Sequence, residues 1–155
     1  MLLSSLFNGT RLTRNIRRAF RLTVGERTLL MRAVAWFPAV EVGLRLFPLR
    51  RLLELFQWGA HPDAVAANVS PERAGRLVEA ASRMYPFGPT CLKKALVLYA
   101  LLRRRGLKVQ LLLGTAKENG ELKAHAWVEH DGAPISAVAE IDRYARLCSL
   151  DHALG

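Results

Sequence analysis

The sequence predicts an α+β fold, in which a helical N-terminal half precedes one further helix and an antiparallel β-meander. Apolar residues recur at helical spacing in several segments before residue 105. After that point the runs become strand-like, and two turn signals separate them, Asn119-Gly120 and Asp131-Gly132. Because Asn-Gly readily adopts the positive φ angles of a tight hairpin, we expect neighbouring antiparallel strands there.

Length and charge limit the class of protein. With 155 residues the chain is long enough for one domain with a real core, and we expect a single domain over 1–155. Its helical half should cover residues 1–86, and the part made of the central helix and the β-meander should cover residues 87–155. The 23 Lys and Arg residues exceed the 13 Asp and Glu residues, and the net charge of +10 favours acidic partners or a solvated surface. Basic residues are spread through apolar helical patterns without a recognised nucleic-acid motif, so nucleic-acid binding is not expected.

The N-terminal segments and the cysteines bear on location. Residues 1–21 begin apolar and turn basic, as in a peripheral amphipathic segment or a loosely ordered arm. Leu29–Phe47 is apolar but contains charges and a proline, so a transmembrane helix is not expected, while contact with an anionic membrane surface stays open. Cys91 and Cys148 follow no disulfide or metal-binding pattern. Without a signal peptide, we therefore expect a cytoplasmic protein that holds no metal.

Three helical stretches are expected before residue 60. Thr23 and Glu26 form a capping box, which predicts a helix start. Pro38 should interrupt or kink this helix, because proline lacks the N–H group and its ring clashes with the preceding turn. Further helical stretches are expected at Val40–Phe47 and Leu49–Trp58.

A further helix should begin at Pro71 with Ser70 as its N-cap and should run to Met84. The stretch before it, Gly59–Val69, is the least periodic part of the chain and is expected to be a loop. The rigid turn Tyr85–Pro89 then leads into the central helix.

The central helix carries the first candidate residue. Thr90 can cap its start, and Gly106, after three arginines, is a typical stop. Helical spacing predicts that one face is buried, made of Leu92, Ala95, Leu96, Tyr99 and Leu102. Cys91 falls in the first turn, where the positive end of the helix dipole stabilises a thiolate. The backbone N–H of Cys91 is also a candidate oxyanion donor.

Three strands are expected next, at Leu107–Thr115, Leu122–His130 and about Ala133–Val138. The remainder, Glu140–Gly155, is expected to form a short helix and a tail. The second strand contains His125. A cysteine at a helix start and a histidine on a later strand form the thiol–imidazole pair used in acyl chemistry, whereas each residue alone has a simpler structural interpretation.

A carboxylate could orient the imidazole of His125 and stabilise it when charged. If Asp131-Gly132 is a two-residue hairpin loop, Val138 lies opposite His125, and Glu140 lies one diagonal step away. Glu140 is therefore the candidate third catalytic residue. Asp142 is the alternative if the strand ends early, although both acids also suit an ordinary helix start.

Two other side chains lie on the same face as His125 in this register. Ser136 could take the orienting hydrogen bond in a weaker form. Trp127 is expected mainly as a packing wall beside His125, and it is also a candidate substrate-binding residue.

Three runs resemble the leader peptidases of lasso peptide biosynthesis, which belong to the transglutaminase-like cysteine protease superfamily. The runs are Phe87–Leu96, Leu101–Leu107 and Ala124–Glu129. The resemblance is specific over Gly88–Gly132 and extends in weaker form to Leu44–Leu52. It implies a helical N-terminal half packed on a papain/transglutaminase-like core, with Cys91 as the nucleophile and His125 as the base.

The resemblance also implies a function. Such an enzyme removes the leader peptide from a ribosomally synthesised lasso peptide precursor by thiolate attack at the leader–core junction. The chain looks like the stand-alone protease subunit, since residues 1–88 leave no room for a fused leader-recognition domain. Its partners would be the precursor, a separate leader-recognition protein and the lasso cyclase. No cofactor is implied, and stimulation by ATP is left open.

The sequence departs from the family at one position and leaves two other functions open. The family usually carries an acidic residue where Ala137 stands here, so Glu140 or Asp142 replaces it, a dyad operates, or activity is impaired. With an amine instead of water as acceptor, the same fold would be an acyltransferase or transglutaminase. A catalytically inactive module would act instead by binding through its basic helices.

Overall fold

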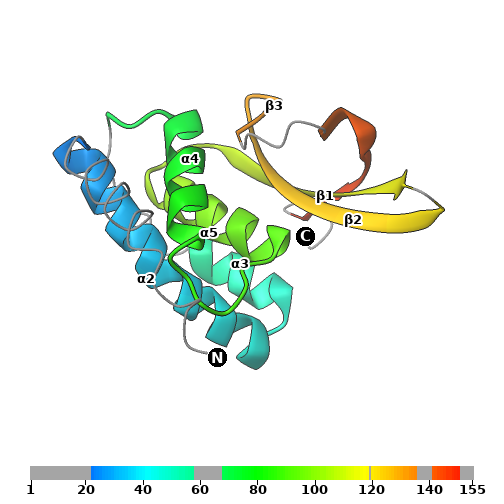
Figure 1. Cartoon of the computed structure of the whole chain (residues 1–155), viewed down its shortest axis with the longest axis horizontal. Coiled ribbons are helices and arrows are strands. Elements are labelled where there is room, and N and C mark those ends of the chain that lie inside the picture. The colour runs from blue at the N-terminus through cyan, green and yellow to red at the C-terminus, as the bar shows by residue number, and fades with distance from the viewer. Residues whose placement is uncertain (1–21, 58–67, 119, 136–140, 151–155) are drawn as a thin grey trace, which may run out of the picture.

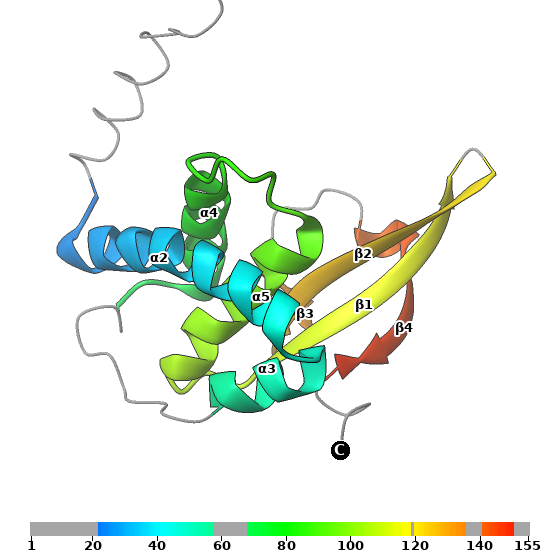
Figure 2. The same cartoon turned by 90° about the horizontal axis from the view of Figure 1, so that it is seen from below.

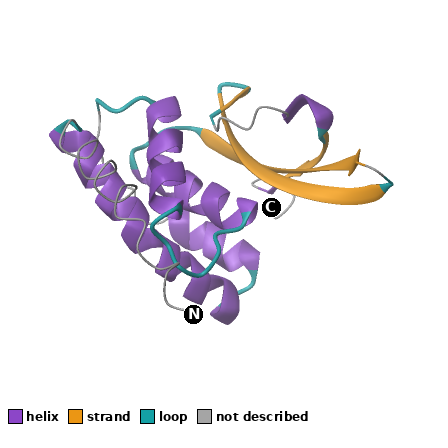
Figure 3. Cartoon of the chain, in the orientation of Figure 1, coloured by secondary structure: helices purple, strands orange, loops and turns teal. Residues whose placement is uncertain are grey.

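The computed structural model describes residues 22–57, 68–118, 120–135 and 141–150. The helices are α2 (Val24–Leu46), α3 (Leu49–Gln57), α4 (Pro71–Ser82) and α5 (Cys91–Arg104). The strands are β1 (Val109–Glu118), β2 (Glu121–His130), β3 (Ala133–Pro134) and β4 (Ala145–Ser149), with a short 3-10 helix, η1 (Ile141–Arg143), before the last strand. The helices gather on one side and the sheet on the other (Figures 1 and 3). This arrangement is the predicted α+β fold class.

The sheet has the strand order β3-β2-β1-β4, and every neighbouring pair is antiparallel. β1 and β2 form the predicted hairpin: Glu118 pairs with Glu121, and Gly120 in the turn has a φ of 86°. β2 and β3 join through the predicted two-residue loop, since His130 pairs with Ala133. The long hairpin curves away from the helices (Figure 2). The predicted strand residues after position 135, including Val138, lie outside the described residues.

The C-terminal segment departs from the prediction of a short helix and a tail. The short helix is present as η1, but Ala145–Ser149 forms β4, which pairs with β1 on the edge away from β2. Thr115 of β1 pairs with Ala145, so the pairing joins segments thirty residues apart. A five-residue strand of this kind forms because a distant edge offers hydrogen bonds, and its own sequence carries little signal.

Of the two expectations for Pro38, an interruption or a kink, the interruption is wrong, and the separate stretch expected at Val40–Phe47 is part of α2. α2 runs continuously through Pro38, which is exposed, while Phe37 and Val40 on either side are fully buried. Burial of these neighbours in the core offsets the hydrogen bond that a proline cannot donate. The predicted capping box is present, because Thr23 accepts a hydrogen bond from the N–H of Glu26 and donates its own N–H to the Glu26 carboxylate.

The central helix α5 is buried more completely than its periodicity predicts. Every residue from Ala95 to Leu102 is at most 5% exposed, so the burial extends around the whole helix. α5 contacts α2, α3 and α4 on one side and β1 and β2 on the other. It therefore fixes the position of its first residue, Cys91, relative to both layers. None of the helices that the structure describes combines the length and the apolar character needed to span a bilayer.

Candidate active site

Cys91 is the first residue of α5, where local interactions define the helix start. Gly88 turns the chain with a φ of 58°, and the Thr90 hydroxyl accepts a hydrogen bond from the backbone N–H of Lys93 at 3.3 Å. The backbone N–H of Cys91 belongs to the first turn, whose N–H groups have no acceptor within the helix. Cys91 is half-buried and is not part of a disulfide.

His125 lies near the middle of β2, opposite Gly114 of β1. Its ring stacks on Trp127, with ring centres 6.3 Å apart and an angle of 16° between the planes. It also contacts Tyr144, which follows η1, at a centre-to-centre distance of 5.2 Å. The imidazole is thus held by one aromatic ring on its own strand and another from the C-terminal segment.

The two faces of β2 have different neighbours. Ala126 and Val128 join the main core with the helices, whereas Trp127 packs with Leu112, Ile141 and Tyr144 in a second cluster. Trp127 is only 1% exposed, which fits the expected packing wall beside His125. Its role as a substrate-binding residue stays a prediction.

Gly114 makes room for the ring of Trp127. A Cβ atom at this position would lie 2.7 Å from Cη2 of Trp127 and 2.8 Å from the carbonyl oxygen of Ala145. Neither Gly114 nor Tyr144 is among the candidate residues predicted from the sequence. A glycine inside a strand pattern signals a close approach of this kind, but it does not say which group approaches.

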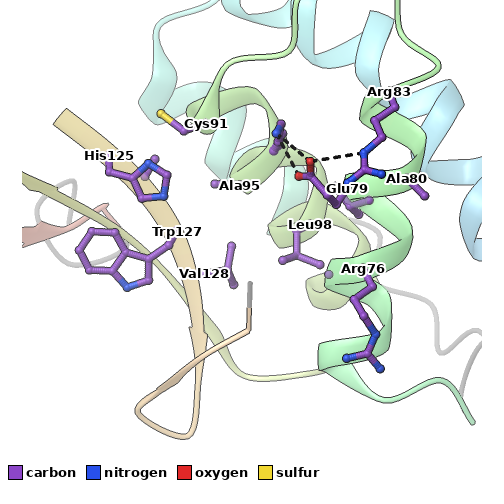
Figure 4. Close-up of a pocket in the computed structure, with 14 residues that line it drawn as sticks. Arg76, Glu79, Ala80, Arg83, Cys91, Ala95, Leu98, His125, Trp127 and Val128 are labelled. Atoms are coloured by element: carbon purple, nitrogen blue, oxygen red, sulfur yellow. Dashed lines mark hydrogen bonds and ion pairs between the residues drawn. The ribbon is translucent and has the colours of Figure 1, made fainter. Parts of the chain in front are cut away.

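Cys91 and His125 line the same cavity, which has a volume of about 620 Å³ and lies between α4, α5 and β2. Figure 4 shows the two residues at one end of this cavity, with the side chains of α4 across from them. Its apolar lining includes Ala95, Leu98 and Val128, and its charged lining consists of Arg76, Glu79, Arg83 and Lys94. The cavity is large enough for a segment of peptide to reach both candidate residues.

Burial, and to a smaller extent the positive charge of Lys94, lower the pKa of His125 from its ordinary value of 6.5. The Lys94 amine is itself paired with the carboxylate of Glu79, at 3.0 and 3.2 Å. A lowered pKa keeps the imidazole neutral near neutral pH, and a neutral imidazole can accept a proton from a thiol.

Nε2 of His125 is buried, and among the described residues it has no hydrogen-bond partner. A buried polar atom without a partner is costly, so a group that binds Nε2 is to be expected. Glu140, Ser136 and Ala137 lie outside the described residues, as does the side chain of Asp142. The third catalytic residue therefore stays a prediction.

Glu129 is a buried carboxylate that was not among the candidate residues predicted from the sequence. It is 2% exposed, and it accepts a hydrogen bond from Nε1 of Trp127 at 2.9 Å. Its second partner is Arg146 of β4, whose guanidinium lies 2.8 Å away. The sequence does not predict the contact of Arg146 with Glu129, because this contact depends on β4.

Across the described residues no group of His, Cys, Asp and Glu is arranged to hold a metal ion.

The sequence also identifies the family to which the chain belongs. The sequence matches the transglutaminase-like superfamily over residues 34–149, which covers the helices from within α2 and the whole sheet. The chain therefore belongs to the transglutaminase-like superfamily, whose members are typically cysteine-dependent enzymes. The search of curated proteins and the search of solved structures returned no match.

Proposed function

From membership of the transglutaminase-like superfamily, we propose that this protein is a cysteine peptidase that removes the leader from a ribosomally synthesised lasso peptide precursor. One observation carries the chemical part of the proposal: Cys91, at the start of α5, and His125, on β2, line the same cavity. The resemblance of the runs around these two residues to lasso leader peptidases supports the choice of substrate.

In the first step, neutral His125 accepts the proton of the Cys91 thiol, and the thiolate attacks the carbonyl carbon at the leader–core junction. The negative charge that develops on the carbonyl oxygen is stabilised by the backbone N–H of Cys91 and by the helix dipole of α5. When the tetrahedral intermediate collapses, the C–N bond breaks and protonated His125 gives its proton to the departing amine of the core peptide.

In the second step, water hydrolyses the thioester that joins the leader to Cys91. His125 accepts a proton from this water, and the new C–O bond replaces the C–S bond, which frees the leader carboxylate and the thiol. A carboxylate on Nε2 would hold the imidazole in the correct tautomer during both steps. Glu140 or Asp142 is the proposed source of this carboxylate. Either would replace the acidic residue that the resembling family usually carries at the position of Ala137.

A separate leader-recognition protein would deliver the precursor, and the lasso cyclase would take the released core peptide. The net charge of +10 supports the attraction of an acidic leader or partner, because complementary charge accelerates encounter. The cavity contributes to this charge with Arg76, Arg83 and Lys94 against Glu79.

The proposal is tested by incubating a lasso precursor and its leader-recognition protein with the wild-type chain or with Cys91→Ala, followed by intact-mass analysis. Free leader formed by the wild type and not by Cys91→Ala is the expected result. Leader joined to an added primary amine would instead identify an acyltransferase. Equal cleavage by both chains would contradict the assignment of Cys91.

Failure of both chains to cleave, with the recognition protein shown to bind the leader, would contradict the proposed peptidase activity and favour a binding module. If the wild type cleaves, Glu140→Ala and Asp142→Ala identify the third catalytic residue. Loss of an orienting carboxylate lowers kcat by about 10⁴-fold in other triads. The variant that removes the third catalytic residue should therefore lose nearly all cleavage activity.

A further inference from the structure

We propose that Glu129 and Arg146 act through Trp127 on His125, as positioning residues that favour the protonated imidazole during the reaction. The proposal rests on the proposed function of His125 as the base that takes the Cys91 proton. It concerns a second source of negative charge for this histidine, distinct from the proposed acid on Nε2.

The contacts form a continuous chain from β4 to the imidazole. The guanidinium of Arg146 lies 2.8 Å from Oε1 of Glu129, and the same oxygen accepts the indole N–H of Trp127 at 2.9 Å. The indole then stacks on the ring of His125 at a plane angle of 16°. Glu129 therefore touches the candidate base only through Trp127.

Burial gives the carboxylate its influence. Glu129 is 2% exposed, while the side chain of its cationic partner, Arg146, is 58% exposed. Water screens the exposed guanidinium more strongly than it screens the buried carboxylate. A carboxylate kept below the surface by an exposed partner leaves a net negative potential on the indole side of the network.

The indole can pass this charge to His125. Aromatic rings attract a cation over their faces, and tryptophan does so most strongly. An indole N–H bound to a carboxylate donates more electron density to its ring, because hydrogen-bonded groups polarise one another. When His125 accepts the proton of Cys91, its imidazolium lies beside this electron-rich ring, in a nearly parallel plane with the ring centres 6.3 Å apart, and is stabilised by it.

The other charged and titratable groups around His125 do not replace this contribution. Lys94 of α5 disfavours the imidazolium, and its partner Glu79 of α4 neutralises part of that effect. Cys91 lies at the start of α5, and Tyr144 offers a second aromatic ring after η1. Among the described residues, the Glu129 carboxylate is the anion tied to an aromatic partner of His125.

Gly114 supports the same arrangement by allowing the indole to approach the backbone of β1 closely. No side chain fits at this position, because the Trp127 ring and the Ala145 carbonyl occupy the space. The indole is therefore fixed between β1 and the C-terminal segment, in a plane nearly parallel to that of the imidazole.

The first measurement is an NMR titration of the His125 imidazole in the full chain, for wild type, Glu129→Gln and Trp127→Phe. His125→Gln identifies its signal among the four histidines. Glu129→Gln keeps the size and the hydrogen-bond acceptor while it removes the charge, and Trp127→Phe keeps a ring while it removes the N–H. Both variants should lower the midpoint of the titration, and the double variant should lower it no further than the stronger single one.

The matched control is Glu121→Gln, which removes a carboxylate from the turn end of the same hairpin, four residues before His125 in β2. It should leave the titration unchanged. In the cleavage assay, Glu129→Gln should lower kcat about tenfold with little change in KM, since the lost interaction exists only with the imidazolium.

An unchanged His125 titration in Glu129→Gln and Trp127→Phe would overturn the proposal and leave the network a purely structural one. Should Glu129→Gln not fold, Trp127→Phe decides in the same way, because it keeps the Glu129–Arg146 pair. The titration needs no substrate, so it decides this proposal even if the chain cleaves no precursor.

Discussion

The two halves of the candidate site are built in different ways. Cys91 is positioned by its immediate neighbours, namely the positive φ of Gly88 and the cap of Thr90. His125 is positioned by partners far away in the sequence, which include Gly114 on β1 and Tyr144 after η1. The cysteine half should therefore respond to local changes at a helix start, and the histidine half to changes in distant packing.

The largest effect on stability is expected from Gly114→Ala, which places a Cβ against the Trp127 ring and a backbone carbonyl. Such overpacking typically lowers the free energy of unfolding by about 1–3 kcal/mol, and the cost should be visible in urea denaturation. Activity should fall as well, because the indole that contacts His125 must move.

Gly43→Ala is the matched control in the helical half. Its Cβ would also lie 2.7 Å from a neighbour, but that neighbour is the flexible end of Leu52, which can move. Alanine favours a helix over glycine by about 1 kcal/mol, so the variant should be near neutral or slightly more stable. Equal destabilisation by both variants would contradict the rigid packing assigned to the histidine half.

The second comparison uses two helix caps. Thr90→Ala and Ser70→Ala each remove a side-chain oxygen that accepts a backbone N–H at the start of a helix. Each should lower the free energy of unfolding by about 1 kcal/mol. Only Thr90→Ala should also slow the cleavage, because the N–H groups around Cys91 lose their fixed arrangement. Equal cleavage rates for the two variants would show that the cap does not position the nucleophile.

The third prediction concerns pH and the histidine half. The folded chain binds a proton at His125 less readily than the unfolded chain, because burial lowers the pKa from 6.5. This residue's contribution to stability is therefore present above pH 6.5 and is lost as the pH falls through the lower folded pKa. In urea denaturation, the free energy of unfolding of the wild type should fall more than that of His125→Gln between pH 6.5 and the lower folded pKa. Parallel plots of this free energy against pH for the two chains would contradict the burial of the imidazole.

The smallest effect is expected from Lys94→Gln. Removing its positive charge should raise the pKa of His125 and move the acidic limb of the kcat/KM profile to higher pH. Lys93→Gln is the control on the same turn of α5, since Lys93 pairs with Glu41 of α2 instead. A shift of equal size in both variants would exclude a specific effect of Lys94.

The same contrast explains what the sequence could and could not predict. The caps at Ser70 and Thr90, both hairpin turns and the placement of Cys91 follow from short-range rules, and the structure agrees with them. β4 depends on a distant partner strand, and the contacts of Tyr144 and Arg146 depend on β4 and the segment before it. The interruption expected at Pro38 is wrong for a related reason, because core packing on both sides of this residue outweighs a local rule.

The central claim is that Cys91 forms a covalent intermediate, and acid-quenched intact-mass analysis of the chain during turnover tests it most directly. The wild-type chain, mixed with precursor and leader-recognition protein, should carry a transient adduct equal to the leader less one water. Peptide mapping should place this adduct on Cys91 and not on Cys148. Cleavage without any adduct, at a rate that Cys91→Ala leaves unchanged, would contradict the claim.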